Sequence, residues 1–205
     1  VPAAFHAGVQ DILLIAFGLA WAEFLNGAAP AIGIDVEGHG RHEELGSDLD
    51  LSHTVGWFTN KYPVSLPVSD LRWLQVVTGE AALGAAIKEA KEHLRALPDG
   101  LGYGLLRYLN DDVDLEAPDP SIAFNYLGRL GTATGSFGDG WRLNHDGLAV
   151  IGAAEAVPMP LTHAVTLNAG AVDTDSGIRL HAEWTWATSI LDDSDIGALG
   201  ARWFE

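Results

Sequence analysis

A stretch of apolar residues near the N-terminus constrains the fold more than any other feature of this sequence. Residues 9–25 are predicted to form a helix that is apolar on nearly all sides, and such a helix must be buried between layers. Its most apolar part, residues 12–22, is far shorter than the roughly 20 residues that a membrane span needs. The N-terminus also lacks the basic region and cleavage pattern of a signal peptide. We therefore expect a buried helix in a soluble protein.

The composition narrows the possible functions. Hydrophobic residues make up 48% of the chain, which is enough for a substantial core. The formal net charge of −17, from 28 acidic and 11 basic residues, makes nucleic-acid binding improbable because such a surface repels phosphate backbones. The chain has no cysteine, which excludes disulfides, thiolate catalysis and cysteine-based zinc sites and fits a cytoplasmic location.

The first half of the chain predicts two strands and a long helix. Residues 31–36 are typical of an inner strand, and residues 61–68 are typical of an edge strand because they contain Pro63 and Pro67. Ser69 and Asp70 are predicted to cap the long helix, which ends near Gly100. The apolar stripe of this helix recurs every three or four residues, at Leu83, Ile87, Ala90, Leu94 and Leu97.

The second half predicts a short helix, three strands and a final helix. The short helix covers residues 103–109, and the strands cover residues 122–127, 161–171 and 178–186. The last two strands form a hairpin around residues 173–177, and the final helix covers residues 193–204. Residues 131–147 are glycine-rich and predict a long loop or crossover. The whole chain, residues 1–205, is predicted to form one α/β layered sandwich with a mixed sheet covered by helices.

Five segments, taken together and in order, resemble motifs of the epimerization domains of nonribosomal peptide synthetases. They are Asp11-Ile12-Leu13-Leu14 with Ala16 and Gly18, Glu37-Gly38-His39-Gly40-Arg41, Thr54-Val55-Gly56-Trp57-Phe58-Thr59 with Tyr62-Pro63-Val64, Gly100-Leu101-Gly102-Tyr103-Gly104, and Phe124-Asn125-Tyr126-Leu127-Gly128. The resemblance implies the fold of the condensation and chloramphenicol acetyltransferase superfamily. In that fold two lobes form a V, and this chain would be the C-terminal lobe.

The sequence departs from the family pattern at two places. The family usually has arginine where this chain has His53. The paired-histidine motif of the family's first lobe is not matched in this sequence, and residues 144–147 share only loose letters with it. The resemblance therefore implies that this chain carries half of an active site and is inactive alone.

The resemblance implies that Glu37 is one acid–base group for epimerization and that the missing lobe's histidine is the other. Epimerization of a thioester removes the Cα proton and returns it to the opposite face, and a buried carboxylate can serve as the base. Gly38 and Gly40 would leave room for the thioester and its phosphopantetheine arm. The alternative is that Glu37 is a solvated residue in a glycine turn.

The other candidate residues each have a structural alternative. Asn125 and Tyr126 would orient the thioester or stabilise the enolate oxygen, or Tyr126 would simply pack in the sheet. Trp57 and Phe58 are expected mainly in the core, with the wall of a substrate channel as the alternative. His39 would contact substrate or support the loop near Glu37.

The remaining expectations concern cofactors, partners and competing functions. Glu37, His39 and His42 lack the helical spacing of a zinc site, so no metal is expected. The cofactor is expected to be the phosphopantetheine arm of a peptidyl carrier domain, with that carrier and the N-terminal lobe as partners. The carrier is expected to be acidic like this chain, so docking would rely on a local patch. A peptide-bond-forming condensation lobe and a non-catalytic docking module are the alternatives; the motif at Glu37 disfavours the first.

Overall fold

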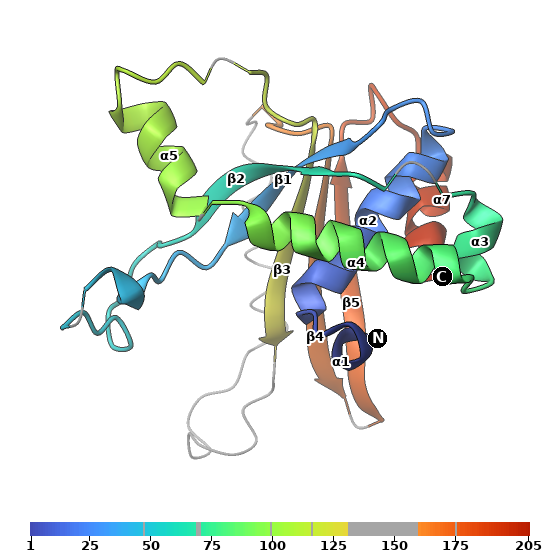
Figure 1. Ribbon diagram of the computed structural model, residues 1–205, viewed down its shortest axis with the longest axis horizontal. Coiled ribbons are helices and arrows are strands. Elements are labelled where there is room, and N and C mark those ends of the chain that lie inside the picture. The colour runs from blue at the N-terminus through green and yellow to red at the C-terminus, as the bar shows by residue number, and fades with distance from the viewer. Residues whose placement is uncertain (47, 69–70, 99, 116, 131–159, 175) are drawn as a thin grey trace.

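The protein folds around a mixed five-stranded sheet with helices packed on one face (Figure 1). The computed structural model describes residues 1–46, 48–68, 71–98, 100–115, 117–130, 160–174 and 176–205. The helices are α1 (Pro2–Phe5), α2 (Val9–Phe24), α3 (Trp73–Val77), α4 (Ala81–Ala96), α5 (Gly100–Leu109) and α7 (Asp193–Phe204), with a short 3-10 helix, η1 (Glu43–Leu45). The strands are β1 (Ile32–Gly38), β2 (Asn60–Leu66), β3 (Ile122–Leu130), β4 (Val165–Thr174) and β5 (Gly177–Trp186). This arrangement confirms the predicted α/β fold.

Helix α2 is the buried helix that the apolar N-terminal stretch predicts. Asn26 and Gly27 end it with positive φ angles of 53° and 65°. The ring of Phe17 is fully buried and lies 5.7 Å from the ring of Phe124 and 5.8 Å from that of Trp184. Helix α2 therefore packs across strands β3 and β5, and its burial anchors the core.

The strand order is β2-β1-β3-β4-β5. The outer pairs, β1 with β2 and β4 with β5, are antiparallel, whereas β1 with β3 and β3 with β4 are parallel. The prolines of the β2 segment correctly predicted an edge strand, and Pro63 lies opposite Asp35. The predicted hairpin between β4 and β5 is also confirmed, with Thr174 opposite Gly177.

Strands β1 and β3 meet along a short line of pairing, which we call the β1–β3 seam. In the described part of the chain this seam consists of two residue pairs, Asp35 with Ala123 and Val36 with Phe124. Helix α2 contacts both strands and therefore bridges the seam.

Alternate residues of each strand divide the sheet into two faces. The helix-covered face, toward α2, α4 and α7, carries apolar side chains: Ile34, Val36, Val64, Phe124, Leu167 and Trp184. The polar face, on the other side, carries Asp35, Glu37, Asn125, Asn168 and Glu183. A shift of one residue in the pairing register of a strand would move its apolar side chains to the polar face and its polar side chains to the helix-covered face.

The start predicted for the long helix after residue 68 is wrong. Two helices occupy the region, because Gly79 adopts a φ of 65° that interrupts α3 and lets α4 begin after Glu80. The expected caps, Ser69 and Asp70, lie outside the described residues. The apolar stripe of α4 is confirmed, since Ile87 and Ala90 are buried in the core.

Several other boundaries agree closely with the sequence. Helix α7 covers the predicted residues, and its N-cap is Asp192, whose carboxylate accepts hydrogen bonds from the backbone of Ser194 and Asp195. Strand β1 extends two residues further than predicted, because Glu37 and Gly38 still pair with β2. Residues 131–147, predicted as a loop or crossover, lie outside the described residues.

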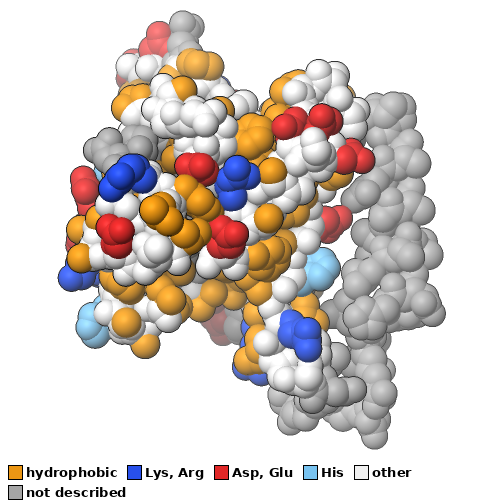
Figure 2. All heavy atoms as spheres, turned by 90° about the vertical axis from the view of Figure 1, so that its right-hand side faces the viewer, with side chains coloured by type: hydrophobic (Ala, Val, Ile, Leu, Met, Phe, Trp, Pro, Cys, Tyr) orange, Lys and Arg blue, Asp and Glu red, His pale blue; other side chains and the backbone are white. Residues whose placement is uncertain are grey.

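Figure 2 looks onto the end of the molecule where α3 and α7 lie, and it shows acidic and basic side chains scattered among hydrophobic ones. Leu74 of α3 and Phe204 of α7 are well exposed at 65% and 58%. Among the residues described, no helix is both long and apolar enough to cross a membrane.

Candidate functional site

The polar face of the sheet presents one polar side chain from each strand, in a line that we call the cross-sheet row. Lys61 on β2 lies opposite Glu37, and Asn168 on β4 lies between Asn125 and Glu183. Glu37 and Asn125 are each two residues beyond the pair of Asp35 with Ala123, so they point to the same face from neighbouring strands. The structure therefore places Glu37 and Asn125 on the same face of neighbouring strands, and their joint role in one site stays a prediction.

Glu37 lies inside strand β1 rather than in the turn that follows. Its side chain is half-buried, and within the described residues its carboxylate has no hydrogen-bond or ion-pair partner. The interpretation of Glu37 as a fully solvated turn residue is therefore wrong. A half-buried carboxylate without a bound cation or donor is able to accept a proton from a reactant.

Gly40 is required by the chain itself. Its φ is 66°, and a Cβ added there would lie 1.5 Å from the carbonyl oxygen of Phe58. A Cβ at Gly38 would meet Oδ1 of Asn60 at 2.5 Å, which is the end of a side chain that can move. The space beside Gly40 is thus taken by backbone, whereas the space beside Gly38 can be opened.

Arg41 holds the loop that follows β1. Its guanidinium donates to the carbonyl oxygens of Leu51 (2.6 Å) and Thr54 (3.0 Å) and lies 4.4 Å from the centre of the Phe58 ring. Its backbone N–H donates to Nδ1 of His39 at 3.0 Å. His39 is exposed and therefore supports the loop while its ring remains accessible.

Outside residue 47, which is not described, the loop between β1 and β2 projects away from the sheet (Figure 1). Trp57 is 90% exposed at its surface, and Phe58, half-buried against Arg41, does not belong to the hydrophobic core. The expectation that these two aromatic residues are core residues is therefore wrong. The apolar residues of an irregular loop have no regular spacing that would predict which side chains are buried.

Asn125 and Tyr126 lie on opposite faces, because neighbouring residues of a strand alternate. Asn125 is half-buried on the polar face, whereas Tyr126 packs against the core on the helix-covered face. The structure therefore does not bring Tyr126 together with Glu37 and favours the sheet-packing alternative for its ring.

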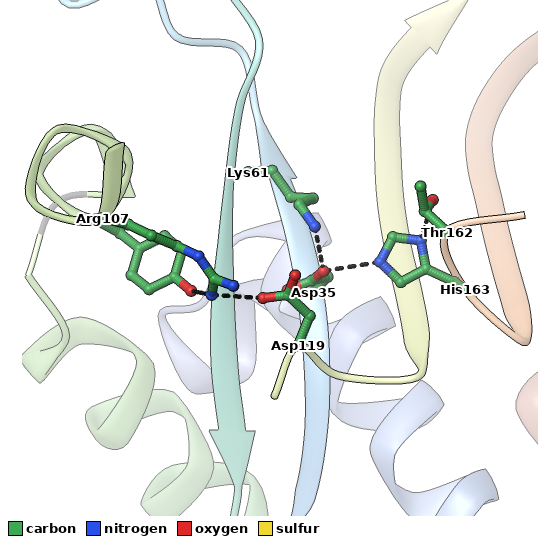
Figure 3. A network of polar contacts seen from close by, with 7 residues as sticks. Asp35, Lys61, Arg107, Asp119, Thr162 and His163 are labelled. Atoms are coloured by element: carbon green, nitrogen blue, oxygen red, sulfur yellow. Dashed lines mark hydrogen bonds and ion pairs between the residues drawn. The ribbon is translucent and has the colours of Figure 1, made fainter. Parts of the chain in front are cut away.

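Beside the cross-sheet row lies a buried ionic network that the sequence did not indicate (Figure 3). Asp35 is 1% exposed, and its Oδ2 lies 2.6 Å from Nζ of Lys61 and 2.7 Å from Nε2 of His163. Nδ1 of His163 lies 3.0 Å from the hydroxyl of Thr162. Since an ionised carboxylate only accepts, Nε2 donates to Asp35 and Nδ1 accepts from Thr162 in the neutral tautomer.

The charge of Lys61 is strengthened by its surroundings. Partial burial of Lys61 works to lower the pKa of its ammonium, but that pKa is raised overall, chiefly by the hydrogen bond and the charge of Asp35. Asp119 and Tyr108 also raise it. Lys61 is therefore a firmly protonated cation next to Glu37.

Helix α5 is tied to the same region. The guanidinium of Arg107 donates to the Tyr103 hydroxyl and to Asp119 at 2.6 Å. The pKa of Arg107 is raised, mainly by the hydrogen bond to Tyr103. Asp119 lies in the segment that leads into β3, so this pair connects α5 to the sheet (Figure 3).

Weak signals for some of these residues were present in the sequence. Asp35 interrupts an apolar run two residues before Glu37, which is the spacing of one strand face. His163 carries no signal at all, because it meets Asp35 from 128 residues away along the chain.

Comparison with known proteins places these features in one family. Residues 2–185 match the condensation domain family. A linear gramicidin synthase of Brevibacillus parabrevis is 33% identical over 207 residues, which is 97% of this chain and 4% of that protein. Surfactin synthase subunit 2 of Bacillus subtilis (strain 168) is 46% identical over 123 residues, which is 60% of this chain and 3% of that protein. The chain thus spans a few hundredths of the length of these relatives.

Solved structures share the fold. The epimerization domain from the third module of tyrocidine synthetase B superposes with a TM-score of 0.71 at 25% identity, covering 100% of this chain and 42% of that one. PapA2 acyl transferase superposes with a TM-score of 0.52 at 14% identity, covering 98% of this chain and 39% of that one, which is a likeness of fold alone.

Proposed function

Because this chain belongs to the condensation domain family, we propose that it is the C-terminal lobe of an epimerization domain in a nonribosomal peptide synthetase. Its task would be to convert an L-aminoacyl or L-peptidyl thioester, held on a carrier domain, to the D-epimer. The observation that carries the proposal is the half-buried carboxylate of Glu37, which has no partner within the described residues and lies on the polar face beside Asn125. The match to a known epimerization domain over 42% of its length agrees with one lobe of two.

In the proposed reaction, the carboxylate of Glu37 removes the Cα proton of the thioester. The electron pair of the broken C–H bond moves into an enolate, and the proton resides on Glu37. The Asn125 side-chain amide lies on the same face and would donate to the enolate oxygen. Reprotonation from the opposite side of Cα, by the histidine of the N-terminal lobe, completes the inversion.

The other predicted residues take less direct parts. Trp57 and His39 are exposed and are available to contact the thioester or its arm. Gly38 lies where a side chain would crowd the end of β1, while Gly40 maintains the turn that follows β1. Tyr126 would act through packing of β3, since its ring is on the other face.

The reactive group would arrive on the phosphopantetheine arm of the carrier domain. The carrier is expected to be acidic, and this chain has a net charge of −17, so long-range attraction would not bring them together. Docking would depend on a local basic or apolar patch or on the N-terminal lobe. Carrier binding that strengthens at low salt would contradict this proposal for docking.

Exchange of the Cα proton for deuterium tests the proposal most directly. The synthetase that contains this chain, with both lobes present, is incubated in heavy water with an aminoacyl thioester on its carrier. We expect exchange and D-product in the wild type, and a loss of about 10²–10⁴-fold in Glu37→Gln, because the amide cannot take the proton.

Glu183→Gln is the matched control, because Glu183 is an exposed glutamate of the same face on strand β5. We expect it to keep wild-type exchange. Full exchange in Glu37→Gln would remove Glu37 from the mechanism and overturn the proposal.

Peptide-bond formation is the second candidate, and it is favoured by the match of residues 2–185 to the condensation domain family. A condensation domain would join two carrier-bound substrates and would give no D-product. An enzyme that forms the peptide bond but shows no Cα exchange would establish this alternative. The absence of both activities in the intact synthetase would favour a docking module.

A further inference from the structure

The pairing of β1 with β2 sets Lys61 directly opposite Glu37. Directly opposite residues of an antiparallel pair have Cβ atoms about 4.5–5.5 Å apart, and opposite charges at such positions normally attract each other. A lysine placed there would be expected to neutralise the carboxylate that the proposed reaction needs as a base.

The lysine is engaged elsewhere. Its Nζ lies 2.6 Å from Oδ2 of Asp35, and in the described residues it forms no ion pair with Glu37. The side chain of Asp35 is 2% exposed and that of Lys61 is 37% exposed. Burial decides the competition, because a carboxylate out of water gains more from a cation than one that water still reaches.

His163 strengthens this arrangement. Its Nε2 lies 2.7 Å from the same oxygen of Asp35, so the carboxylate is held from two directions (Figure 3). A carboxylate fixed in this way cannot swing toward solvent and release Lys61.

We infer that Asp35 is a positioning residue that holds the ammonium of Lys61 away from Glu37 and so leaves the Glu37 carboxylate free to accept the Cα proton. The inference rests on the proposed function, in which Glu37 is the base. It assigns a role to Asp35 and Lys61 that concerns the reactivity of Glu37 and not contact with substrate.

The other charged groups near this pair do not substitute for Lys61. On the α5 side, Asp119 and Tyr108 act on Lys61, and Arg107 is paired with Asp119. Across the sheet from Glu37, Asn125 is uncharged and Glu183 is an acid.

In the turn after β1, the two nearby imidazoles stack on each other with ring centres 6.1 Å apart. They belong to His39 and His42. His39 uses Nδ1 to accept from Arg41, and His42 lies 3.5 Å from the amide of Asn60. In the described chain, Lys61 is thus the cation that the strand register aims at Glu37.

The test uses Cα exchange by the complete synthetase, measured against pH. In Asp35→Asn, Lys61 loses its anionic partner and is free to pair with Glu37. We expect the acid limb of the pH profile to move toward acid by about one pH unit and the plateau rate to fall about 3–10-fold, since a cation makes a carboxylate a weaker base.

Removal of the lysine gives the decisive control. Asp35→Asn combined with Lys61→Met has no cation to misdirect, so we expect its pH profile and plateau to return to within about twofold of wild type. Lys61→Met alone leaves the buried Asp35 carboxylate without its cation on the same face as Glu37, so we expect its acid limb to move toward higher pH, opposite to Asp35→Asn.

Two results would overturn the inference. One is a pH profile of exchange that does not change in Asp35→Asn. The other is a loss of exchange rate in Asp35→Asn that is equal at every pH and is not restored when Lys61→Met is added, which would show a merely structural role. Glu37→Gln, measured in parallel, separates these results from failure of the proposed function, because exchange that survives Glu37→Gln removes the base itself.

Discussion

The two faces of the same sheet have opposite requirements, although they are built from alternate residues of the same strands. On the helix-covered face, Val36 and Phe124 are almost fully buried and their neighbours are apolar, so any hydrophobic side chain of suitable volume would satisfy the site. On the polar face, Glu37 and Asn125 are half-buried, and Asp35 is buried only because two donors bind it. Stability thus resides in one set of residues and the proposed chemistry in the set beside it.

The contrast between the two faces depends on strand register. Phe124 and Asn125 are neighbours in sequence, yet one packs against Phe17 and the other points to the cross-sheet row. A change at one position should therefore affect folding, and a change at the next should affect activity.

The largest difference is expected when these two neighbours are truncated separately. Phe124→Ala removes a fully buried ring from the contact with α2 and should lower the free energy of unfolding by about 3–5 kcal/mol. Asn125→Ala should cost less than about 1 kcal/mol of stability but impair exchange, because the proposed enolate donor is lost. Urea unfolding of each variant measures the contrast; equal costs would show that the two faces are not distinct.

A smaller effect is expected at the turn that ends the polar face. Gly40→Ala places a Cβ where the Phe58 carbonyl oxygen lies and requires a positive φ, so the loop must shift. We expect a loss of about 1–3 kcal/mol together with weaker exchange, since the turn follows Glu37 directly. Gly102→Ala is the control, because a Cβ there meets nothing within 4 Å. Similar losses in both variants would contradict a specific need for glycine at Gly40.

The smallest effect is expected at acid pH, in the N-cap of helix α7 on the helix-covered face. Hydrogen bonds from the Ser194 side chain and from the backbone of Asp195 and Ser194 hold the pKa of Asp192 below its ordinary value of 3.8. Because the pKa of Asp192 is lower in the folded state, the ionised cap stabilises α7 at any pH above the ordinary pKa. This stabilisation is lost as the pH falls through the lowered pKa of the folded protein. Fluorescence of Trp203 on α7 should report loosening at the acid end, and Asp192→Asn should flatten that part of the titration. A titration that Asp192→Asn leaves unchanged would assign the acid loosening to other groups.

Much of the fold could be predicted because its signals are local. The all-round apolar helix, the alternation in β5 and the capped helix α7 each follow from short-range patterns that tertiary contacts only reinforce. The prediction of one long helix ending near Gly100 is wrong, because Gly79 adopts a left-handed turn that breaks it, and a single glycine in a helical pattern does not by itself signal such a break.

The site was only partly predictable. The motifs point to Glu37 and Asn125, and the strand register places both on one face. The same motif points to Tyr126, but one-residue alternation puts its ring on the other face, and the aromatic character of Trp57 does not reveal that its side chain is exposed. The contact of Asp35 with His163 joins distant parts of the chain, and no short-range pattern encodes such a contact.

The short β1–β3 seam has a consequence for how the sheet opens. In the described residues the seam pairs only two residues of each strand, and α2 packs on both strands, whereas β4 and β5 pair along their whole length. Backbone amides of β4, which is paired on both sides, should therefore exchange with solvent only when the whole chain unfolds, while those bordering the seam exchange through local separation. Glu37 lies on β1 and Asn125 on β3, so separation of the two strands at the seam would increase the distance between these two residues.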